Sequence, residues 1–246
     1  MAVGETGVGE MVGGDNVSPE EVARFDAMAA RWWDPRGPMR PLHEMNPLRV
    51  GWVSRRIAQR FPDPGAVRLL DVGCGAGLAA EALARRGYDV LGIDAAPDAI
   101  RAARDHARAR GLRLAYRVAE AEGLSGERFE AITALEVIEH VPDPARFIHA
   151  LARLLAPGGV LFLSTLNRTP RAFLLAKIGA EYVLGLLPRG THDWRRFLRP
   201  AELGAMLRAA GLRVNDSSGM IKDPLGGGWR TSRDLSVNYI VAAGAD

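Results

Sequence analysis

The sequence predicts an α/β fold in which helices cover both faces of a mostly parallel sheet. Between residues 66 and 166, short runs rich in leucine and β-branched residues alternate with alanine-rich segments of helical character. A cluster of glycines follows the first of these runs, as is common where a parallel strand turns into a helix. Of the 246 residues 48% are hydrophobic and 25% charged, which excludes a fibrous or largely disordered chain.

Two helices and a leader are expected ahead of the sheet. Residues 1–17 hold five glycines and few large apolar side chains, so we expect a disordered leader and a single domain over 18–246. Residues 18–21 form a capping box with Pro19 at the first helical position. A proline-rich stretch follows this first helix, and a second helix is expected from Pro47 to about Arg60. The N-terminal helices thus occupy 18–61.

The core of the sheet is expected over residues 66–166. Its strands are predicted at 67–72, 89–93, 112–118, 130–135 and 160–165, and its helices at 78–86, 97–110 and 143–155. Strands that alternate with helices form βαβ units, so these strands should be parallel. An insertion at 170–200, a helix at 200–210 and two strands at 212–217 and 236–242 follow, and the last two strands can pair as an antiparallel edge.

Composition also limits the function. No stretch approaches the roughly 18 to 20 apolar residues of a membrane-spanning helix, and the first residues lack the pattern of a signal peptide, so a cytoplasmic protein is expected. Cys74 is the single cysteine, which excludes an internal disulfide. The net charge is +3, and the arginines are scattered among acidic neighbours, so nucleic acid is not expected as a partner.

The glycines after the first strand predict a ligand site at the carboxyl end of the sheet. Gly73, Gly75 and Gly77 are spaced G-x-G-x-G, whereas a dinucleotide site requires G-x-G-x-x-G. Leu78 stands where the third glycine of that motif would be, so a nicotinamide dinucleotide fits poorly. Taken alone, the glycines are also compatible with a plain tight turn.

Two carboxylates near the glycine turn indicate what kind of ligand this site binds. Asp71 immediately precedes the turn, and it suits a cationic group better than a pyrophosphate. Asp94 ends the second strand, 21 residues after Gly73, where a carboxylate can accept hydrogen bonds from both ribose hydroxyls. The pattern indicates a nucleoside that carries a positive charge and no phosphates.

These motifs resemble those of the class I S-adenosylmethionine-dependent methyltransferases. The resemblance rests on DVGCGAG at 71–77, Asp94, and LLAPGG at 154–159 ahead of the fifth strand. It implies a Rossmann-like sheet of seven strands, with helices on both faces and an antiparallel last strand.

Over about residues 18–242 the chain is similar to the ubiquinone-biosynthesis O-methyltransferase family. The likeness lies in residues 25–53, in ALEVIEHVPDP at 134–144, in STLNRTPRAF and GAEYVLGLLPRGTHDW, and in the late VNYIVAA. That family methylates phenolic hydroxyls on polyprenylated rings in both O-methylation steps of its pathway. The resemblance implies that Arg49, Gly73, Asp94 and Leu135 contact S-adenosylmethionine, with Arg49 at the methionine carboxylate and Leu135 near the adenosyl end.

Glu136, Glu139 and His140 are the candidate catalytic residues. A sulfonium methyl is already activated, so the enzyme must mainly align the acceptor oxygen and remove its proton. A helical turn over 136–140 would bring these side chains together, and they could then hold magnesium, which the family resemblance supports. Alternatively, the two glutamates cap or pair near the next helix and His140 packs under the pocket. We expect Glu139 and His140 to be needed for turnover, and Gly73 and Asp94 for cofactor affinity.

The insertion suggests where an acceptor enters. Residues 171–188 are largely apolar, and in the family resembled this region is linked to membrane association, so peripheral contact with the inner membrane face is expected. A helix packed over the acceptor pocket is the alternative. Asn167, His192 and Asp193 either line that pocket or serve loop structure. By resemblance the substrate is a polyprenyl phenol or catechol, and a complex with other quinone-pathway enzymes is expected.

Three competing functions are compatible with parts of the pattern. A methyltransferase for another small phenol or a carbon acceptor is opposed by the resemblance of the flanking segments. A nicotinamide-dependent oxidoreductase is opposed by Leu78. A non-catalytic nucleoside-binding module is opposed by Glu136, Glu139 and His140.

Overall fold

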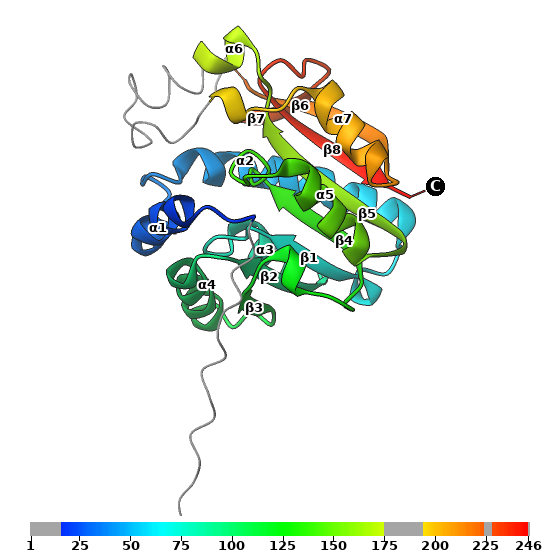
Figure 1. Cartoon of the computed structure of the whole chain (residues 1–246). Helices are drawn as coiled ribbons and strands as arrows, with labels where there is room; N and C mark the ends of the chain where they lie inside the picture. Colours follow the sequence, from blue (N-terminus) through cyan, green and yellow to red (C-terminus); the bar gives the residue numbers. More distant parts are fainter. Residues whose placement is uncertain (1–15, 175–193, 224–227, 246) are drawn as a thin grey trace, which may run out of the picture.

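A mixed sheet forms the centre of the molecule. The computed structural model describes residues 16–174, 194–223 and 228–245, and in these residues eight strands are ordered β3-β2-β1-β4-β5-β8-β6-β7 (Figure 1). The strands are β1 (Arg68–Val72), β2 (Asp89–Asp94), β3 (Ala115–Val118), β4 (Phe129–Leu135), β5 (Leu155–Leu166), β6 (Arg213–Lys222), β7 (Trp229–Ser232) and β8 (Asn238–Gly244).

The first five strands are parallel, and the remaining strands pair antiparallel. The predicted Rossmann-like class, with helices on both faces and an antiparallel end, is therefore confirmed. The predicted number of strands was one too low, because β7 forms a hairpin with β6 at the sheet edge. Its four residues, WRTS, include a single apolar side chain, so no periodic run of apolar residues marks this strand in the sequence.

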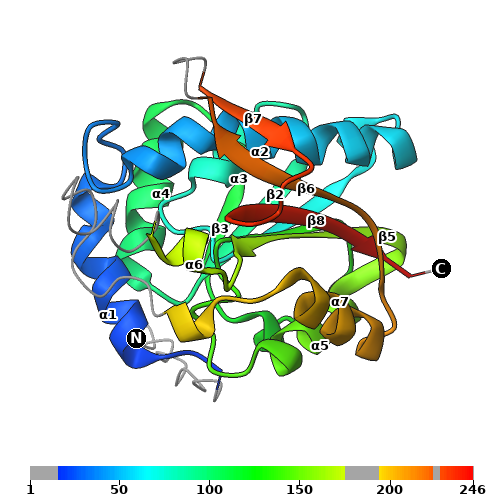
Figure 2. The ribbon, with the colours of Figure 1, turned by 90° about the horizontal axis from the view of Figure 1, so that it is seen from above.

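Helices pack on both faces of the sheet (Figure 2). One face is covered by α2 (Arg40–Arg60), α3 (Leu78–Ala84) and α4 (Pro97–Ala109), whose buried side chains include Ile57, Leu83 and Ile100. The other is covered by α5 (Pro144–Leu154) and α7 (Pro200–Ala209), which bury Ile148 and Leu203. Short turns complete the described fold: η1 (Ala29–Arg31), η2 (Pro64–Ala66), η3 (Ala121–Gly123), α6 (Pro170–Ala172) and η5 (Trp194–Arg196).

The N-terminal region departs from two predictions. Helix α2 begins at Arg40 and contains Pro47, which had been expected to start it. A proline removes one backbone hydrogen bond, but the buried side chains of α2 continue through this point, so packing keeps the helix whole. Asn16, which was expected to lie in a disordered leader, is buried, and its side chain bonds the backbone of Asp143. Residues 1–15 lie outside the described residues.

Helix α1 (Pro19–Met28) lies at the carboxyl ends of the parallel strands, beside α4 (Figures 1 and 2). One half of the predicted capping box is present, because Ser18 Oγ accepts a hydrogen bond from the backbone N–H of Glu21 at 3.5 Å, while the Glu21 side chain bonds Arg24 and His140. Asp26 of α1 accepts hydrogen bonds from the backbone N–H groups of Asp98 and Ala99 in the first turn of α4. Because Ala96 at the N-cap of α4 has no capping side chain, α1 supplies that cap.

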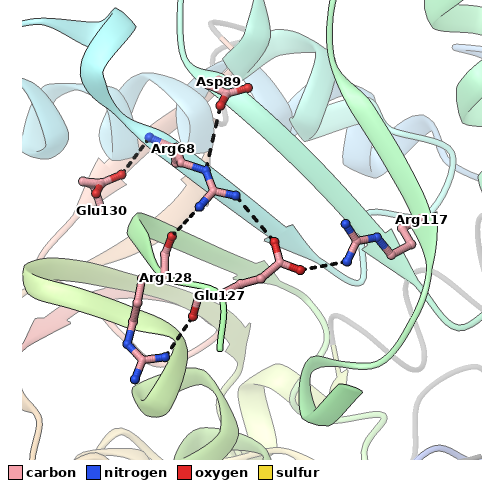
Figure 3. Close-up of polar contacts among 6 residues, drawn as sticks. All are labelled: Arg68, Asp89, Arg117, Glu127, Arg128 and Glu130. Carbon is pink, nitrogen blue, oxygen red and sulfur yellow. Dashed lines mark hydrogen bonds and ion pairs between the residues drawn. The ribbon is translucent and has the colours of Figure 1, made fainter. Parts of the chain in front are cut away.

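The amino ends of the strands are joined by exposed charges (Figure 3). Arg68 starts β1 and forms ion pairs with Asp89, at 4.0 Å, and Glu127, at 3.5 Å. Its backbone N–H donates to Glu130, and Glu127 also pairs with Arg117 at 2.8 Å. The network links β1, β2, β3 and β4 at the edge away from the glycine turn. In the parts of the chain that the structure describes, no helix is long and apolar enough to cross a membrane.

Candidate active site

The glycine turn and Asp94 form one hydrogen-bonded unit. Gly73, Gly75 and Gly77 all have positive φ angles, of 65°, 54° and 90°. The backbone N–H of Gly75 donates to Asp94 Oδ2 at 2.8 Å, and that of Ala96 donates to Oδ1 at 2.9 Å. The carboxylate is thereby held at the carboxyl end of β2, as the sequence predicted.

The three glycines leave room for different neighbours. A Cβ at Gly73 would lie 2.5 Å from a methyl carbon of Val137, on the wall of a cavity. A Cβ at Gly75 would meet the ring of Trp32, and one at Gly77 would meet the hydroxyl of Tyr116. All three glycines thus admit a neighbouring side chain, and of the three only Gly73 lies on the wall of the cavity.

A cavity opens between α1 and the carboxyl ends of β1, β2, β3 and β4. Five of the predicted residues lie on its wall, while Arg49, Asp71, Gly75, Gly77 and Glu139 are not among the described residues that line it. The wall comprises Asn16, Val17, Ser18, Glu21, Val22, Phe25, Trp32, Leu42, Val72, Gly73, Asp94, Ala95, Ala119, Glu120, Ala121, Glu122, Leu135, Glu136, Val137, His140, Val141 and Phe147.

A group of buried charges lies next to this cavity. Arg49 is 3% exposed and feels the charges of Asp71, Glu136 and Glu139, yet its Nε and Nη1 have no hydrogen-bond partner among the described residues. Burial raises the pKa of Asp71 to about 6 and that of Glu139 to about 7. Burial also raises the pKa of Asp94. Donors of a buried guanidinium without partners fit a ligand carboxylate, and the surplus of acidic groups fits a ligand with positive charge.

The three expected metal ligands do not form a ligand set. Ser164 Oγ donates to Glu136 at 2.9 Å, Thr165 Oγ1 donates to Glu139 at 2.8 Å, and His140 Nδ1 bonds Glu21 at 3.0 Å. Within the described ranges no three His, Cys, Asp or Glu residues are arranged to hold a metal ion.

The helical turn expected over 136–140 is absent, which explains this separation. Glu136 has a φ of 59°, and a three-residue turn follows it, closed by a hydrogen bond from His140 N to the carbonyl of Val137. A positive φ outside glycine costs roughly 1 to 3 kcal/mol and is typical of functional sites. The donors present therefore do not fit the magnesium that the resemblance implied.

Sequence reasoning missed two parts of the site. Residues 119–122 follow β3 and line the cavity. They could have been found, because the carboxyl ends of parallel strands meet at one edge. Glu21 was considered only as part of a capping box, although its side chain reaches His140. No local sequence signal reports such a contact between residues 119 positions apart.

Of the residues predicted to lie near the methyl acceptor, the structure describes only some. Asn167 Nδ2 donates to the carbonyl of Leu235 at 2.8 Å, and the Asn167 N–H donates to that of Val237, which supports a role in loop structure. His192, Asp193 and residues 175–188 of the insertion lie outside the described residues.

Comparisons with known proteins show which family the chain is similar to. Residues 44–217 match a family model described as a methyltransferase domain. The ubiquinone biosynthesis O-methyltransferase of Dinoroseobacter shibae is 49% identical over 237 residues, which cover 92% of this chain and 96% of that protein. The protein of the same name from Methylobacterium nodulans is 47% identical over 239 residues, covering 94% and 96%.

Among solved structures, the fold is similar to magnesium protoporphyrin IX methyltransferase from Synechocystis with bound S-adenosylhomocysteine. The TM-score is 0.67 and the sequence identity 21%, over 92% of this chain and 100% of that one, so this likeness concerns the fold alone. Fold, glycine turn and family model together define a class I methyltransferase that binds S-adenosylmethionine. The near full-length identity adds the particular family: the chain belongs to the ubiquinone biosynthesis O-methyltransferases.

Proposed function

We propose that this enzyme transfers a methyl group from S-adenosylmethionine to a phenolic hydroxyl of a polyprenylated quinone precursor in ubiquinone biosynthesis. The observation that carries the proposal is the cavity whose wall includes Gly73, Asp94 and His140, in a chain so similar to that family. Such a cavity brings a nucleoside site and a titratable group within one enclosure, as methyl transfer to a phenol requires.

The cofactor is proposed to lie along the carboxyl ends of β1 and β2. Asp94 accepts hydrogen bonds from the ribose hydroxyls, Gly73 lets the cofactor approach the backbone, and Leu135 packs near the adenosyl group. Arg49 binds the methionine carboxylate through its unpartnered nitrogens, and Asp71 offers the buried negative charge that an ammonium group requires. Gly75 and Gly77 keep the turn in its conformation by admitting Trp32 and Tyr116.

The reaction is a direct displacement. The phenolic oxygen forms a bond to the methyl carbon, the bond between that carbon and sulfur breaks, and the sulfonium becomes a neutral thioether. The phenolic proton passes to His140, because a phenol with a pKa near that of tyrosine, about 10, is almost wholly protonated at neutral pH. Burial opposes a charge on His140, but the hydrogen bond to Glu21 and the nearby carboxyl groups outweigh it and raise the pKa of His140, which favours the imidazolium that results.

No step of this proposal uses a metal, because Glu136, Glu139 and His140 each bond a different partner. A magnesium requirement, tested by turnover with and without a chelator, would mean that these side chains leave those partners. Such a result would revise the position of the acid–base groups and not the cofactor site.

Turnover and binding can be separated experimentally. We expect Glu139→Ala and His140→Ala to lower the rate of methyl transfer to a polyprenyl catechol, while S-adenosylhomocysteine still binds in isothermal titration. Normal turnover in both variants would contradict the assignment. Transfer to a small phenol but not to the polyprenyl catechol would contradict the proposed substrate.

Peripheral membrane contact and association with other quinone-pathway enzymes are also proposed. The apolar composition of residues 171–188 and the 60% exposed side chain of Leu174 support a surface that meets the membrane interface. Flotation with liposomes, with and without residues 171–188, tests this contact. Equal flotation of the two forms would remove it.

A further inference from the structure

A tryptophan, a histidine and a glutamate form a connected group beside the glycine turn. The rings of Trp33 and His106 are stacked, with an interplanar angle of 8° and ring centroids 3.4 Å apart. His106 Nδ1 bonds Glu81 Oε1 at 2.7 Å. None of the three is among the described residues that line the cavity. The group therefore lies next to the cofactor site and takes no direct part in its wall.

Glu81 gives this group a fixed base. It lies in the first turn of α3, directly after the glycine turn, and its side chain is 0% exposed. Its second oxygen, Oε2, pairs with Arg85 at 2.9 Å. Because a buried carboxylate is costly without partners, Glu81 cannot turn away from either of them cheaply. His106 lies in the last turn of α4, so the pair also joins α3 to α4.

Trp33 connects this base to residues 29–39, the segment that links α1 to α2. Its indole N–H donates to the carbonyl of Ala76 at 3.0 Å, inside the glycine turn. The neighbouring Trp32 is 5% exposed and lines the cavity. The Trp32 ring occupies the space that a Cβ at Gly75 would need. Trp33 thus fastens the linking segment at the point where Trp32 forms part of the cavity wall.

We infer that His106 and Glu81 are positioning residues for cofactor binding, which hold Trp33 and through it keep Trp32 on the glycine turn. A site that is already in its binding shape does not have to be ordered by the ligand, so it binds more tightly. If the segment is held for only part of the time, the apparent affinity falls by that fraction. The inference rests on the proposed function, in which S-adenosylmethionine occupies this cavity.

A second stack in the molecule provides a matched control. The guanidinium of Arg56 lies 3.4 Å from the ring centroid of Trp52 and pairs with Asp216. These three residues are also outside the described cavity wall. Both groups join an aromatic ring to a carboxylate through a basic side chain, but only the group at Trp33 is bonded to the glycine turn. Arg56→Ala should therefore lower thermal stability and leave cofactor affinity unchanged.

Kinetics should separate affinity from turnover. We expect His106→Ala to raise KM for S-adenosylmethionine and Kd for S-adenosylhomocysteine about three- to tenfold. At saturating S-adenosylmethionine, kcat should change less than about twofold, because the bound cofactor selects the enzyme with the segment in place. Glu81→Gln, which keeps an acceptor oxygen for His106, should lose less affinity than Glu81→Ala. Equal affinities of His106→Ala and Arg56→Ala, or a loss confined to kcat, would overturn the inference.

A double-mutant cycle shows whether His106 acts through Trp33. In the Trp33→Ala background, His106→Ala should change Kd for S-adenosylhomocysteine less than about twofold, and the same loss in both backgrounds would overturn the inference. Deuterium exchange of the Trp33 indole N–H, followed by NMR, is an independent readout. His106→Ala should speed this exchange in the empty enzyme, and saturating S-adenosylhomocysteine should slow it again. An exchange rate equal to that of the wild type would contradict the inference.

The wild-type enzyme distinguishes this inference from the proposed function. If it binds S-adenosylhomocysteine but does not methylate a polyprenyl catechol, the proposed acceptor is wrong, and the positioning role is still decided by Kd. If the wild type is active and His106→Ala binds S-adenosylhomocysteine as tightly, only the positioning role is wrong.

Discussion

Two arginines at opposite edges of the sheet each face three carboxyl groups, and their surroundings differ. Arg68, at the amino edge, has a half-exposed side chain that pairs with Asp89 and Glu127, and its backbone bonds Glu130 (Figure 3). Arg49, beside the carboxyl edge, is 3% exposed and has two nitrogens without partners among the described residues.

This difference in burial separates charges that pair with each other in the protein from charges that are available to a ligand. Exposed pairs such as those of Arg68 are solvated and contribute little to stability individually. A buried guanidinium with unused donors is costly for the empty protein, and a ligand that satisfies the donors recovers this cost on binding. We therefore expect substitutions at the carboxyl edge to change cofactor affinity strongly, and those at the amino edge to leave it unchanged.

The largest effect is expected at Asp94, and the other end of β2 provides its control. Asp94→Asn should weaken binding of S-adenosylhomocysteine about a hundredfold, roughly 3 kcal/mol, because an amide nitrogen would face backbone and ribose donors. Asp89→Asn at the other end removes an exposed charge 4.0 Å from Arg68 and should not change the affinity. Isothermal titration measures both, and similar dissociation constants for the two variants would remove Asp94 from the cofactor site.

Two glycines sharpen the comparison further. Gly73 and Gly126 both have positive φ angles, but an added Cβ would crowd Val137 at Gly73 and meet nothing within 4 Å at Gly126. Gly73→Ala should weaken cofactor binding at least about tenfold, whereas Gly126→Ala should cost only about 1 kcal/mol of unfolding free energy through backbone strain. Parallel titration and thermal unfolding distinguish these effects. Loss of affinity in Gly126→Ala would mean that strain alone, without crowding, disturbs the site.

The sequence was sufficient for features that are local in the chain. The positions of the parallel strands along the chain, the glycine turn and the place of Asp94 follow from periodicity and from motif spacing. The positions of Glu136, Glu139 and His140 depended on a helical turn that the positive φ of Glu136 prevents. Contacts made by tertiary packing, such as Glu21 with His140 and Asp26 with α4, leave no local pattern, so they could not be predicted.

A third, smaller effect concerns stability and pH. Burial holds the pKa of Glu139 at about 7, above its ordinary value of 4.5. Between pH 4.5 and about pH 7, the folded state therefore binds a proton on Glu139 that the unfolded state lacks. Stability contributed by this group therefore falls as pH rises through about 7. Glu139→Gln removes the titration and should stabilise the empty enzyme by about 1 to 3 kcal/mol near pH 8, with a smaller gain near pH 6.

Thermal unfolding at both pH values tests this expectation. The matched variant at the amino edge is Glu127→Gln, which loses ion pairs with Arg68 and Arg117 and should be slightly less stable than wild type at either pH. A Glu139→Gln variant that is destabilised near pH 8 would show that its charge is balanced in the empty protein, which would weaken the contrast between the edges.

The smallest effect is expected for Arg68→Ala. The variant loses two long ion pairs and the contact of the guanidinium with the ring of Phe129, whose centroid is 4.9 Å away. Because the side chain is half exposed, the loss should be at most about 1 kcal/mol, or about 2 to 4 °C in Tm for a chain of this size. Salt screens exposed pairs, so the difference from wild type should shrink between about 0.05 and about 0.5 M salt. Affinity for S-adenosylhomocysteine should not change, since Arg68 lies at the edge away from the glycine turn. A loss of affinity would mean that the amino-edge network holds the strands in the register that the cofactor site needs, and the two edges could then no longer be treated as independent.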